Sequence, residues 1–494
     1  MTTKHKVAIF GIGTYYKRIS NELLTVAEVV VFIDNDKNKQ GKKLNEIPII
    51  SPKDLKPDTV ENIIVTSDKY AIDIEKQLIA LGVKKNKIWY CDDFLQSYRQ
   101  GKITLIYQND SLERVCVHGN EATKLIESRA LLDKSVLLIS YHANYNGGSM
   151  AAVHAVMALK SSGYNPVLAV PSIEDKFLEE IIQKGLCVAI CPNLINPSKI
   201  EMDWIGHWQR ILVNTLPMSH ATFAIGKRQK VVAWLHESPE VYESYEHFHN
   251  DFQKAFNEKN VYLYAVSRVA KENFFKYYQC NEHGVGVLPY GLPDLSQDTD
   301  SSISKSNKPI TFALIGGINK EKGVDIYFDA IEKVNKILND KANIAEFLLI
   351  GRNSGSSFAN SMIKRASRIS NVRYIGQKNR EDMGELYSSR IDVVVVASRN
   401  ETMSMTATEA MVFDHIAIVS NISGICDYIT NYYDGLIFES ENSDELASKI
   451  LWCIKHPEKV HSMGINTRKT YKKEFSMEKF SSRLDIVIKE KSNS

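Results

Sequence analysis

Short apolar runs alternate with amphipathic stretches along most of the 494-residue chain. Runs such as VAIF (7–10), SVLLIS (135–140) and DVVVVAS (392–398) predict strands, and the helical periodicity of 150–163 and 324–338 predicts helices between them. Further strands are predicted at 28–33, 62–67, 165–170, 187–190, 230–235, 261–266, 310–316, 345–351, 372–376 and 416–420. Strands that alternate with helices are typical of parallel sheets, so the predicted fold class is α/β.

Two polar stretches divide this series into three α/β units. The first, from about Gln100 to Lys134, has no clear period, and the second, LSQDTDSSISKSNKP (295–309), has the composition of an exposed linker. We therefore expect α/β units at 1–100, 134–295 and 306–475, a linker at 101–133, and a closing helix within 476–494.

The composition narrows the class of protein. Lys and Arg number 61 and Asp and Glu 59, so the net charge is +2, without the basic excess that a dedicated nucleic-acid binder needs. No stretch reaches the ~18 apolar residues that span a bilayer, and the N-terminus does not resemble a signal peptide. Among the seven scattered cysteines only Cys187 and Cys191 lie close together, which favours reduced thiols over disulfides or zinc. We expect a cytoplasmic protein.

A glycine-bearing turn follows the first predicted strand. Gly11 and Gly13 can bring backbone N–H groups close to a phosphate, and Asp34, at the end of the next strand, can accept a hydrogen bond from a ribose hydroxyl. Tyr16 occupies the place of the third glycine in the pattern G-x-G-x-x-G. A nucleotide site and a plain strand-to-helix turn are both open alternatives here.

Two features of the central unit come directly after predicted strands. Gly147 and Gly148 precede a helix whose first turn has small residues, and its N–H groups suit a phosphate or sugar oxygen. A capped loop without a ligand is the alternative. His236 and Glu237 follow the strand at 230–235, at the sheet edge where α/β proteins bind ligands. A single histidine is more often a packed or surface residue, but this position favours a functional role for His236.

The central unit also has a candidate membrane-contact edge. Trp204 and Trp208 are four residues apart, and Arg210 and the basic run at 227–230 follow them in the sequence. An amphipathic edge of this kind can touch a membrane surface. Core packing of two tryptophans at helical spacing is the commoner explanation.

The C-terminal unit has two carboxylates eight positions apart. Glu401 lies in a loop after the strand at 392–398, and Glu409 lies in the first turns of a helix that begins near Ser404 or Thr406. One carboxylate can then bind sugar hydroxyls and the other a ribose, with the helix N–H groups on a diphosphate between them. Thr406 and Glu409 also fit a capping box, T-x-x-E, which needs no ligand. The spacing alone does not decide between the two.

Lys322 and Gly323 lie between a strand and a helix, where a lysine can neutralise a diphosphate leaving group. Six elements in order then resemble the retaining family-4 glycosyltransferases of the GT-B fold, mostly bacterial enzymes of surface-polysaccharide assembly. They are Gly147–Gly148, His236–Glu237, VLPYGLPD around Gly291, Lys322–Gly323, the Glu401 and Glu409 pair, and DGLIF (434–438). The resemblance covers about residues 134–475.

The resemblance implies roles for the matched positions. His236 would contact the transferred sugar, Lys322 would bind the diphosphate, Glu401 the sugar hydroxyls and Glu409 the ribose of the nucleotide. The glycine pair would lie by the donor phosphates or the acceptor, and the backbone at 375–376 would meet the base. The implied donor-binding set is Gly147, Gly148, Lys322, Ile375, Gly376, Glu401, Met403, Ser404, Met405, Thr406 and Glu409, and the implied catalytic set is His236, Lys322 and Glu401.

The sequence departs from the family pattern in three places. Gly317 stands where an arginine often joins the lysine on the phosphates, and Arg352 and Arg399 are the candidates to compensate. Tyr290 stands where Asn is usual, and the residues 414–416 replace a common Gly-x-Pro. The first departure concerns the phosphate clamp, whereas we expect the other two to be packing changes.

The first hundred residues carry a resemblance of their own. The segments 32–55, 63–70 and 81–88 resemble the small Rossmann-like domain in front of some bacterial sugar-modifying enzymes, such as sugar acetyltransferases that bind nucleotide-sugars. This resemblance covers about 95 residues and implies a nucleotide or sugar-nucleotide pocket.

Together the resemblances imply two facing Rossmann-like domains of a GT-B fold, preceded by a small Rossmann-like domain. The implied function is transfer of a hexose-type sugar from a nucleotide-sugar donor to a glycan or lipid-linked saccharide acceptor, with retention of configuration. The donor would dock on the C-terminal domain and the acceptor on the central one. No D-x-D-like metal triad is evident, so we expect no metal and no cofactor, and the only membrane contact considered is peripheral, at the inner surface.

Two other functions are open from the sequence. A nicotinamide-dependent or nucleotide-sugar-modifying enzyme could be built on Gly11, Gly13 and Asp34, but it would explain only the first fifth of the chain. A non-catalytic GT-B subunit that stabilises a partner transferase is supported only by the missing arginine at Gly317.

Overall fold

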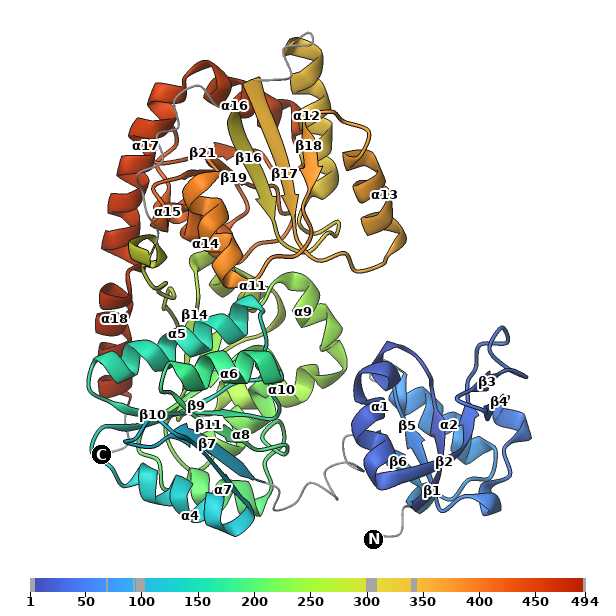
Figure 1. The fold of residues 1–494 in the computed structure, drawn as a ribbon. Helices are drawn as coiled ribbons and strands as arrows, with labels where there is room; N and C mark the ends of the chain where they lie inside the picture. Colours follow the sequence, from blue (N-terminus) through green and yellow to red (C-terminus); the bar gives the residue numbers. More distant parts are fainter. Residues whose placement is uncertain are drawn as a thin grey trace. The chain divides into compact units, whose positions relative to one another are not determined.

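A computed structural model of the protein describes residues 5–67, 70–91, 94, 103–298, 309–338 and 344–491. The chain divides into two compact units, Met1–Ile103 and Thr104–Ser494 (Figure 1). Mostly parallel sheets with helices between consecutive strands make up both units, which confirms the predicted α/β class. The second unit contains two sheets, so the central and C-terminal series of strands fold into one compact body.

The first unit is a six-stranded sheet in the order β3-β4-β2-β1-β5-β6. Its elements are β1 (His5–Phe10), α1 (Thr14–Val26), β2 (Ala27–Ile33), β3 (Lys43–Leu44), β4 (Ile47–Ile50), β5 (Asn62–Val65), α2 (Ala71–Ala80) and β6 (Ile88–Tyr90). Side chains alternate along β1, so Val7 and Ile9 pack with α1 while Ala8 and Phe10 pack with α2. The two helices therefore cover opposite faces of the sheet.

The first sheet of the second unit has the strand order β15-β14-β13-β12-β9-β10-β11-β7-β8. Its strands are β7 (Thr104–Gln108), β8 (Arg114–His118), β9 (Ser135–Ile139), β10 (Asn165–Val170), β11 (Cys187–Ile190), β12 (Ile211–Asn214), β13 (Val231–Leu235), β14 (Val261–Ala265) and β15 (Val285–Val287). Its helices are α4 (Gly119–Ala130), α5 (Gly147–Ser161), α6 (Asp175–Gln183), α7 (Lys199–Ile205), α8 (Ser219–Gly226), α9 (Pro239–Ser244), α10 (His249–Asn257) and α11 (Arg268–Tyr277). Every residue of β9, β12 and β13 is buried, as expected for parallel strands with helices on both faces.

The prediction of a linker at 101–133 was wrong for residues 103–133, the part of this range that the structure describes. Residues 104–130 form β7, β8 and α4, and β7 pairs antiparallel with β11. β8 is an edge strand whose residues alternate between exposed and half-buried, so its hydrophobic period is weak in the sequence. The helix α4 buries only Ala122, Ile126 and Ala130, a narrow apolar stripe among polar residues. The other predicted linker, 295–309, lies mostly outside the described residues.

The second sheet of this unit has the order β18-β17-β16-β19-β20-β21, with all neighbours parallel. Its strands are β16 (Ile310–Ile315), β17 (Ala345–Ile350), β18 (Val372–Tyr374), β19 (Val393–Val396), β20 (Ile416–Ser420) and β21 (Leu436–Phe438). Its helices are α12 (Val324–Leu338), α13 (Ser357–Ala366), α14 (Arg380–Ser389), α15 (Met405–Val412), α16 (Ser443–Lys455) and α17 (Pro457–Thr470). An aromatic and aliphatic core fills the space between this sheet and its helices.

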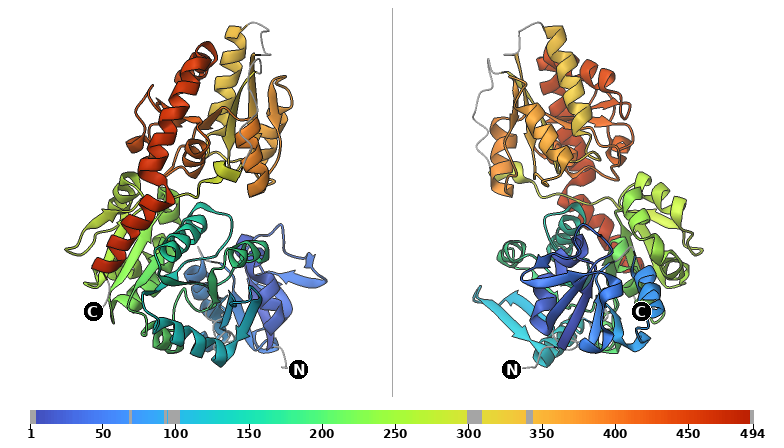
Figure 2. Two further views of the ribbon diagram at one scale, coloured as in Figure 1. Left: turned by 60° about the vertical axis from the view of Figure 1, so that its left-hand side comes forward. Right: turned by 90° about the vertical axis from the view of Figure 1, so that its right-hand side faces the viewer.

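The last helix, α18 (Met477–Glu490), confirms the predicted closing helix and returns to the first sheet of the second unit (Figure 2). The Tyr164 hydroxyl donates to Asp485 at 2.6 Å, and the Ser481 hydroxyl donates to the Ala158 carbonyl at 2.9 Å. A side chain at Gly291 would collide with Phe480, because a Cβ there would lie 2.5 Å from the Phe480 Cβ. The glycine of VLPYGLPD thus allows α18 to pack closely.

Each sheet of the second unit has one point where the strand order reverses. In the first sheet this switch point lies between β9 and β12, and in the second it lies between β16 and β19. Open α/β sheets bind ligands outside the carboxyl ends of the strands at such points. The loops that follow these four strands are therefore the places to look for a site.

Candidate functional site

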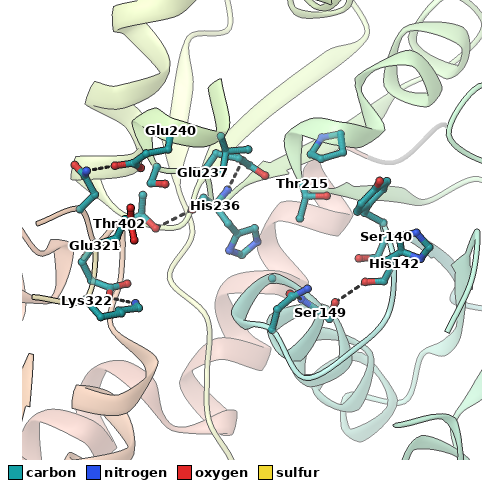
Figure 3. A pocket seen from close by; sticks show the side chains of 18 residues that line it. Ser140, His142, Ser149, Thr215, His236, Glu237, Glu240, Glu321, Lys322 and Thr402 are labelled. Atoms are coloured by element: carbon teal, nitrogen blue, oxygen red, sulfur yellow. Dashed lines mark hydrogen bonds and ion pairs between the residues drawn. The ribbon is translucent and has the colours of Figure 1, made fainter. Parts of the chain in front are cut away.

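A cavity of about 510 Å³ lies where the two switch points of the second unit meet. Its lining includes Ser140, His142, Gly148, Ser149, Thr215, His236 and Glu237 from the first sheet, and Glu321, Lys322, Asn400, Glu401 and Thr402 from the second. Figure 3 shows His236 and Glu237 between the group around Thr215 and the group around Lys322. Four of the residues predicted for the site, Gly148, His236, Lys322 and Glu401, thus line one cavity.

Lys322 and Glu401 form an ion pair at the second switch point. The Lys322 Nζ lies 2.6 Å from the Glu401 Oε2, which also accepts from the Ser398 hydroxyl at 3.1 Å. Gly323 makes this approach possible, since its φ is 65° and a Cβ there would lie 1.8 Å from the Ala397 carbonyl oxygen. The loop after β16 therefore lies directly against the end of β19, and the two charged side chains meet across it.

Glu237 holds the loops after β12 and β13 together. Its two carboxylate oxygens accept from the Leu216 N–H and the His236 N–H, both at 2.7 Å. Burial raises the pKa of Glu237 to about 7, although these two N–H groups favour the charged form. Glu237 thus fixes the backbone of the cavity wall from inside.

His236 presents a neutral imidazole to the cavity. Burial lowers its pKa to about 3, so the ring carries no charge near neutral pH. The ring packs edge-on against Trp234 at 4.4 Å, and its Nε2 is buried without a hydrogen-bond partner. The imidazole can therefore give or take one hydrogen bond to a bound molecule.

The helix α5 begins at the predicted glycine pair. Asn146 caps it by accepting from the Ser149 N–H at 2.8 Å, which confirms a capped loop without deciding whether a ligand also binds there. Gly148 lines the cavity and has the Thr215 side chain over it, since a Cβ at Gly148 would lie 3.2 Å from the Thr215 Cγ2. Gly147 is exposed and is not part of the lining.

Glu409 lies in α15 but does not line the cavity. Its Oε2 accepts from the hydroxyl of buried Tyr387 at 3.2 Å. The N-cap of the helix is Ser404, whose hydroxyl accepts from the Ala407 N–H at 3.3 Å. The capping box between Thr406 and Glu409 was therefore a wrong alternative, because the helix begins two residues earlier than that box requires.

The remaining residues of the predicted donor-binding set lie in loops at the same edge of the second sheet. Met403 and Ser404 are buried and follow Thr402, which lines the cavity; Met405 and Thr406 form the first turn of α15. The Gly376 carbonyl accepts from the Gly351 N–H at 3.0 Å, so the loop with Ile375 and Gly376 lies beside the end of β17.

The three departures from the family pattern have distinct settings. A Cβ at Gly317 would meet only Asn319, at 3.4 Å, so the position has room for a larger residue. The Arg399 guanidinium donates two hydrogen bonds of 2.8 and 2.9 Å to Asp325 and also pairs with Glu441, so two carboxylates already hold it. Arg352 follows the end of β17 and is exposed.

The other two departures are packing features. Tyr290 is 3% exposed, and its hydroxyl lies 3.5 Å from the Thr408 hydroxyl. The His415 Nε2 lies 2.6 Å from the Tyr387 carbonyl oxygen, and a Cβ at Gly464 would lie 2.0 Å from the Asp414 carbonyl oxygen. The 414–416 turn thus packs under α17.

Trp204 and Trp208 are core residues. Both side chains are fully buried, so the membrane-facing role considered for them was wrong. The Lys227 ammonium lies over the Phe223 ring at 4.4 Å, and the Arg228 guanidinium reaches the Met202 carbonyl at 3.5 Å. Lys227 and Arg228 therefore lie on the surface and contact neighbouring groups of α8 and α7.

In the first unit, groups of the chain itself donate hydrogen bonds to Asp34, the carboxylate predicted to bind a ribose. Asp34 accepts from the Ile12 N–H at 3.2 Å, the Asp36 N–H at 2.9 Å and the Lys39 Nζ at 2.9 Å. These contacts hold its pKa below the usual range, against the effect of burial. The turn with Gly11 and Gly13 and the end of β2 are thus brought together, as predicted, but by internal hydrogen bonds.

Sequence reasoning missed the strand β12 and with it Thr215, although the short apolar run ILVN (211–214) was a usable signal. It also missed Thr402, whose hydroxyl donates to the His236 carbonyl at 2.8 Å, and Asn400, whose amide donates to Glu240. These two contacts join the walls of the cavity.

Among the described residues no group of three His, Cys, Asp or Glu side chains has the arrangement of a metal site, and no helix there is long and apolar enough to cross a membrane.

Residues 296–470 match the family model of glycosyl transferases group 1. Residues 3–89 match a second model, described as C2185-like, N-terminal. The range that matches glycosyl transferases group 1 contains Lys322, Glu401 and Glu409.

Two curated relatives are glycosyltransferases. The chain is 29% identical over 166 residues to MJ1178 of Methanocaldococcus jannaschii, which covers 33% of this chain and 44% of that protein. It is also 29% identical over 150 residues to the N,N'-diacetylbacillosaminyl-diphospho-undecaprenol alpha-1,3-N-acetylgalactosaminyltransferase of Campylobacter jejuni, which covers 30% of this chain and 36% of that protein. The chain thus spans less than half the length of these relatives.

The structure resembles that of Alr3699/HepE from Anabaena in complex with UDP-glucose, with a TM-score of 0.59 and 15% identity. The match covers 72% of this chain and 99% of that one. This likeness confirms the predicted GT-B fold with an additional N-terminal domain.

Proposed function

We propose that the protein is a glycosyltransferase that moves a hexose from a nucleotide-sugar to a glycan or lipid-linked saccharide, with retention of configuration. The observation that carries this proposal is the Lys322–Glu401 pair, which faces His236 across one cavity. A cation, a carboxylate and a nearby helix N-terminus suit a diphosphate joined to a sugar. The match of residues 296–470 to glycosyl transferases group 1 and the likeness to a protein bound to UDP-glucose favour the same class of donor.

In this proposal the donor docks on the second sheet. Lys322 leaves Glu401 to bind the diphosphate, and Glu401 then accepts from the sugar hydroxyls. The cap on α15 uses only the Ala407 N–H, so the preceding N–H groups at 405–406 are available to phosphate oxygens. Glu409, which now accepts from the Tyr387 hydroxyl, binds the ribose, and the backbone at Ile375 and Gly376 meets the base. Arg352 is the proposed second cation, since Arg399 is held by Asp325.

In the proposed reaction, the acceptor hydroxyl attacks the anomeric carbon of the donor sugar on the same face from which the diphosphate departs. No covalent nucleophile is assigned, and the departing phosphate takes the proton of the acceptor hydroxyl as the new glycosidic bond forms. Lys322 and the N-terminus of α15 stabilise the charge that develops on the leaving diphosphate. Neutral His236 binds a sugar hydroxyl without adding a charge. The proposal needs neither a metal nor a cofactor.

The test is release of a nucleoside diphosphate when the full chain is incubated with a panel of UDP-, GDP- and ADP-sugars, followed by chromatography. We expect turnover of at least one donor, and Glu401→Gln should lose it. Binding without turnover, with or without acceptor sugars, would favour the non-catalytic subunit. The proton NMR coupling constant of the product's anomeric proton tests retention, because inversion gives the opposite anomer.

We further propose a role in polysaccharide or glycoconjugate assembly, with peripheral contact at the inner membrane surface. The name of the Campylobacter jejuni relative specifies a diphospho-undecaprenol acceptor, and the exposed Lys227 and Arg228 suit anionic headgroups. After sedimentation with phosphatidylglycerol vesicles, we expect the protein in the vesicle pellet at low salt and less of it there at high salt. Lys227→Glu should weaken recovery, and Lys333→Glu is the control on the other sheet. Equal amounts of protein in the supernatant with and without vesicles would contradict membrane contact.

A further inference from the structure

Thr215 has a backbone conformation that side chains rarely adopt. Its φ is 77° and its ψ is 148°, a region occupied almost only by glycine, and threonine is branched at Cβ. The surroundings impose this conformation from both sides. The Thr215 N–H donates to the Trp234 carbonyl at 2.8 Å, and the next N–H, of Leu216, donates to buried Glu237 at 2.7 Å. Strain that is fixed in this way is concentrated at functional sites.

The strained residue lies at the switch point of the first sheet and lines the cavity. It follows β12, whose last residue, Asn214, donates to the Ser140 hydroxyl at 2.9 Å and to the Gly148 carbonyl at 3.1 Å. These bonds fix Thr215 over the start of α5, with its methyl group toward Gly148. Figure 3 shows Thr215 between His236 and the group of Ser140, Ser149 and His142.

The Thr215 hydroxyl is buried and has no hydrogen-bond partner. The Nε2 of His236, on the neighbouring strand end, is in the same state, and β12 and β13 pair directly through Asn214 and Trp234. Most buried polar atoms in folded proteins have partners, so two unpartnered atoms in one cavity wall indicate groups that a bound molecule satisfies. Both atoms can accept a hydrogen bond from a sugar hydroxyl.

We propose that Thr215 positions the acceptor, which is a glycoside whose hydroxyl accepts a hydrogen bond from, or donates one to, the Thr215 Oγ1. This inference rests on the proposed function and extends it, since it names the residue that binds the acceptor on the wall opposite Lys322 and Glu401. The backbone strain turns the hydroxyl toward the cavity at the expense of stability. Glycine at this position would therefore give a more stable protein with a weaker grip on its acceptor.

Three variants separate the hydroxyl from the strain. Thr215→Val keeps the shape and loses the hydroxyl, Thr215→Ser keeps the hydroxyl, and Thr215→Gly loses the hydroxyl and relieves the strain. The readout is transfer from the accepted nucleotide-sugar to p-nitrophenyl glycosides of glucose, galactose and N-acetylglucosamine, with KM determined for acceptor and donor separately. Thr222→Val is the matched control, because the Thr222 hydroxyl is buried and already donates to the Met218 carbonyl at 3.2 Å.

We expect Thr215→Val and Thr215→Gly to raise the KM for the glycoside about three- to tenfold, the loss of one neutral hydrogen bond, with little change in the KM for the donor. Thr215→Ser should stay within about twofold of the wild type. Thr215→Gly should unfold about 2 °C or more above Thr215→Val, because both lack the hydroxyl and only valine keeps the strain.

Three results would overturn the inference. An unchanged acceptor KM in Thr215→Val would remove the hydroxyl from recognition, and equal defects in the Val and Ser variants would assign the effect to packing. Donor hydrolysis by the wild type without transfer to any of the glycosides would show that the acceptor class is wrong. Failure of the proposed function looks different, since the wild type would then consume no nucleotide-sugar at all.

Discussion

In both units a polar side chain lies beside a glycine-bearing turn, with opposite outcomes. In the first unit, Asp34 follows β2 and lies beside the turn with Gly11 and Gly13. Its carboxylate accepts from Ile12, Asp36 and Lys39, so most of its hydrogen-bonding capacity is used internally. In the second unit, Thr215 follows β12 and lies over Gly148, and its hydroxyl lines a cavity without a hydrogen-bond partner. The polar group beside the turn is therefore satisfied by the chain in one place and unpartnered in the other.

The presence or absence of hydrogen-bond partners therefore distinguishes the two places better than the glycine-bearing turns do. A carboxylate has about four acceptor positions, so Asp34, which already accepts three hydrogen bonds, has at most one left for a ribose. A buried atom without a partner gains the full hydrogen bond. We therefore expect substitutions in the second unit to change catalysis and those at Asp34 to change stability.

The largest effect expected is at Lys322. Lys322→Ala should lower kcat by about 10²–10³, since loss of one preorganised charge contact costs on the order of 3–4 kcal/mol in the transition state. The measurement is steady-state release of nucleoside diphosphate. Lys320→Ala, an exposed lysine two positions away, is the control and should stay near the wild-type rate. A loss under about threefold at Lys322 would move the phosphate contact elsewhere, with Arg352 the next residue to test.

The buried carboxyl of Glu237 predicts a pH dependence of stability. Its pKa is raised in the folded protein, so folding favours the protonated form, and its stabilising contribution is lost as the pH rises from about 4.5 to about 7. Glu237→Gln removes this dependence. The unfolding free energy of the wild type relative to the variant should therefore fall by up to about 3 kcal/mol across that window.

Urea titrations of both proteins at several pH values measure this difference. The burial-lowered pKa of neighbouring His236 acts in the opposite direction, losing stability as the pH falls, but it is common to both proteins. A difference that is flat with pH would show that the two N–H donors keep Glu237 ionised in the folded state.

Glu409 tests whether a carboxylate outside the cavity lining joins the site. Glu409→Gln should raise the KM for the donor about tenfold, since a hydrogen bond to a charged group contributes roughly 1.5–3 kcal/mol. Tyr387→Phe is the companion variant because it removes the hydroxyl that Glu409 now accepts from. If both variants lower only the melting temperature, and by similar amounts, Glu409 is a structural partner of Tyr387.

The smallest effect on catalysis is expected at Asp34. Asp34→Asn should destabilise the first unit by about 1–2 kcal/mol, because it weakens hydrogen bonds to a charged group, and should leave sugar transfer intact. Scanning calorimetry of the full chain measures the destabilisation. Asp36→Asn is the control, since the Asp36 side chain accepts from the exposed Asn38 N–H. Loss of nucleotide binding in Asp34→Asn without a change in stability would reverse the comparison between the units.

The sequence pattern predicted the fold well where strands are long and fully buried. All the strands of the second sheet except β21 were predicted, and so was the helix at Val324–Leu338. The edge strand β8 and the short strand β12 were missed, because an exposed edge has a weak period and four residues are too few to establish one.

The sequence indicated which residues come together at the cavity, but not the hydrogen-bond partners that each of them has. Lys322, Glu401 and His236 line one cavity, as expected, because Lys322 and Glu401 follow strands at a switch point and His236 follows β13, the neighbour of switch-point strand β12. The partners of Arg399 are 74 and 42 positions away in the sequence, so its engagement was not visible from spacing. The φ of Thr215 is also set by contacts with distant residues, which no local pattern encodes.

The central claim is that the cavity of the second unit binds the diphosphate of a nucleotide-sugar. Isothermal titration calorimetry of the full chain with UDP, GDP and ADP tests it most directly, with Lys322→Ala and Asp34→Asn as the paired variants. We expect one nucleotide to bind the wild type and Asp34→Asn equally and to bind Lys322→Ala at least tenfold more weakly, a loss of about 1.4 kcal/mol or more. Binding that survives in Lys322→Ala but is lost in Asp34→Asn would contradict it, because the nucleotide would then occupy the first unit.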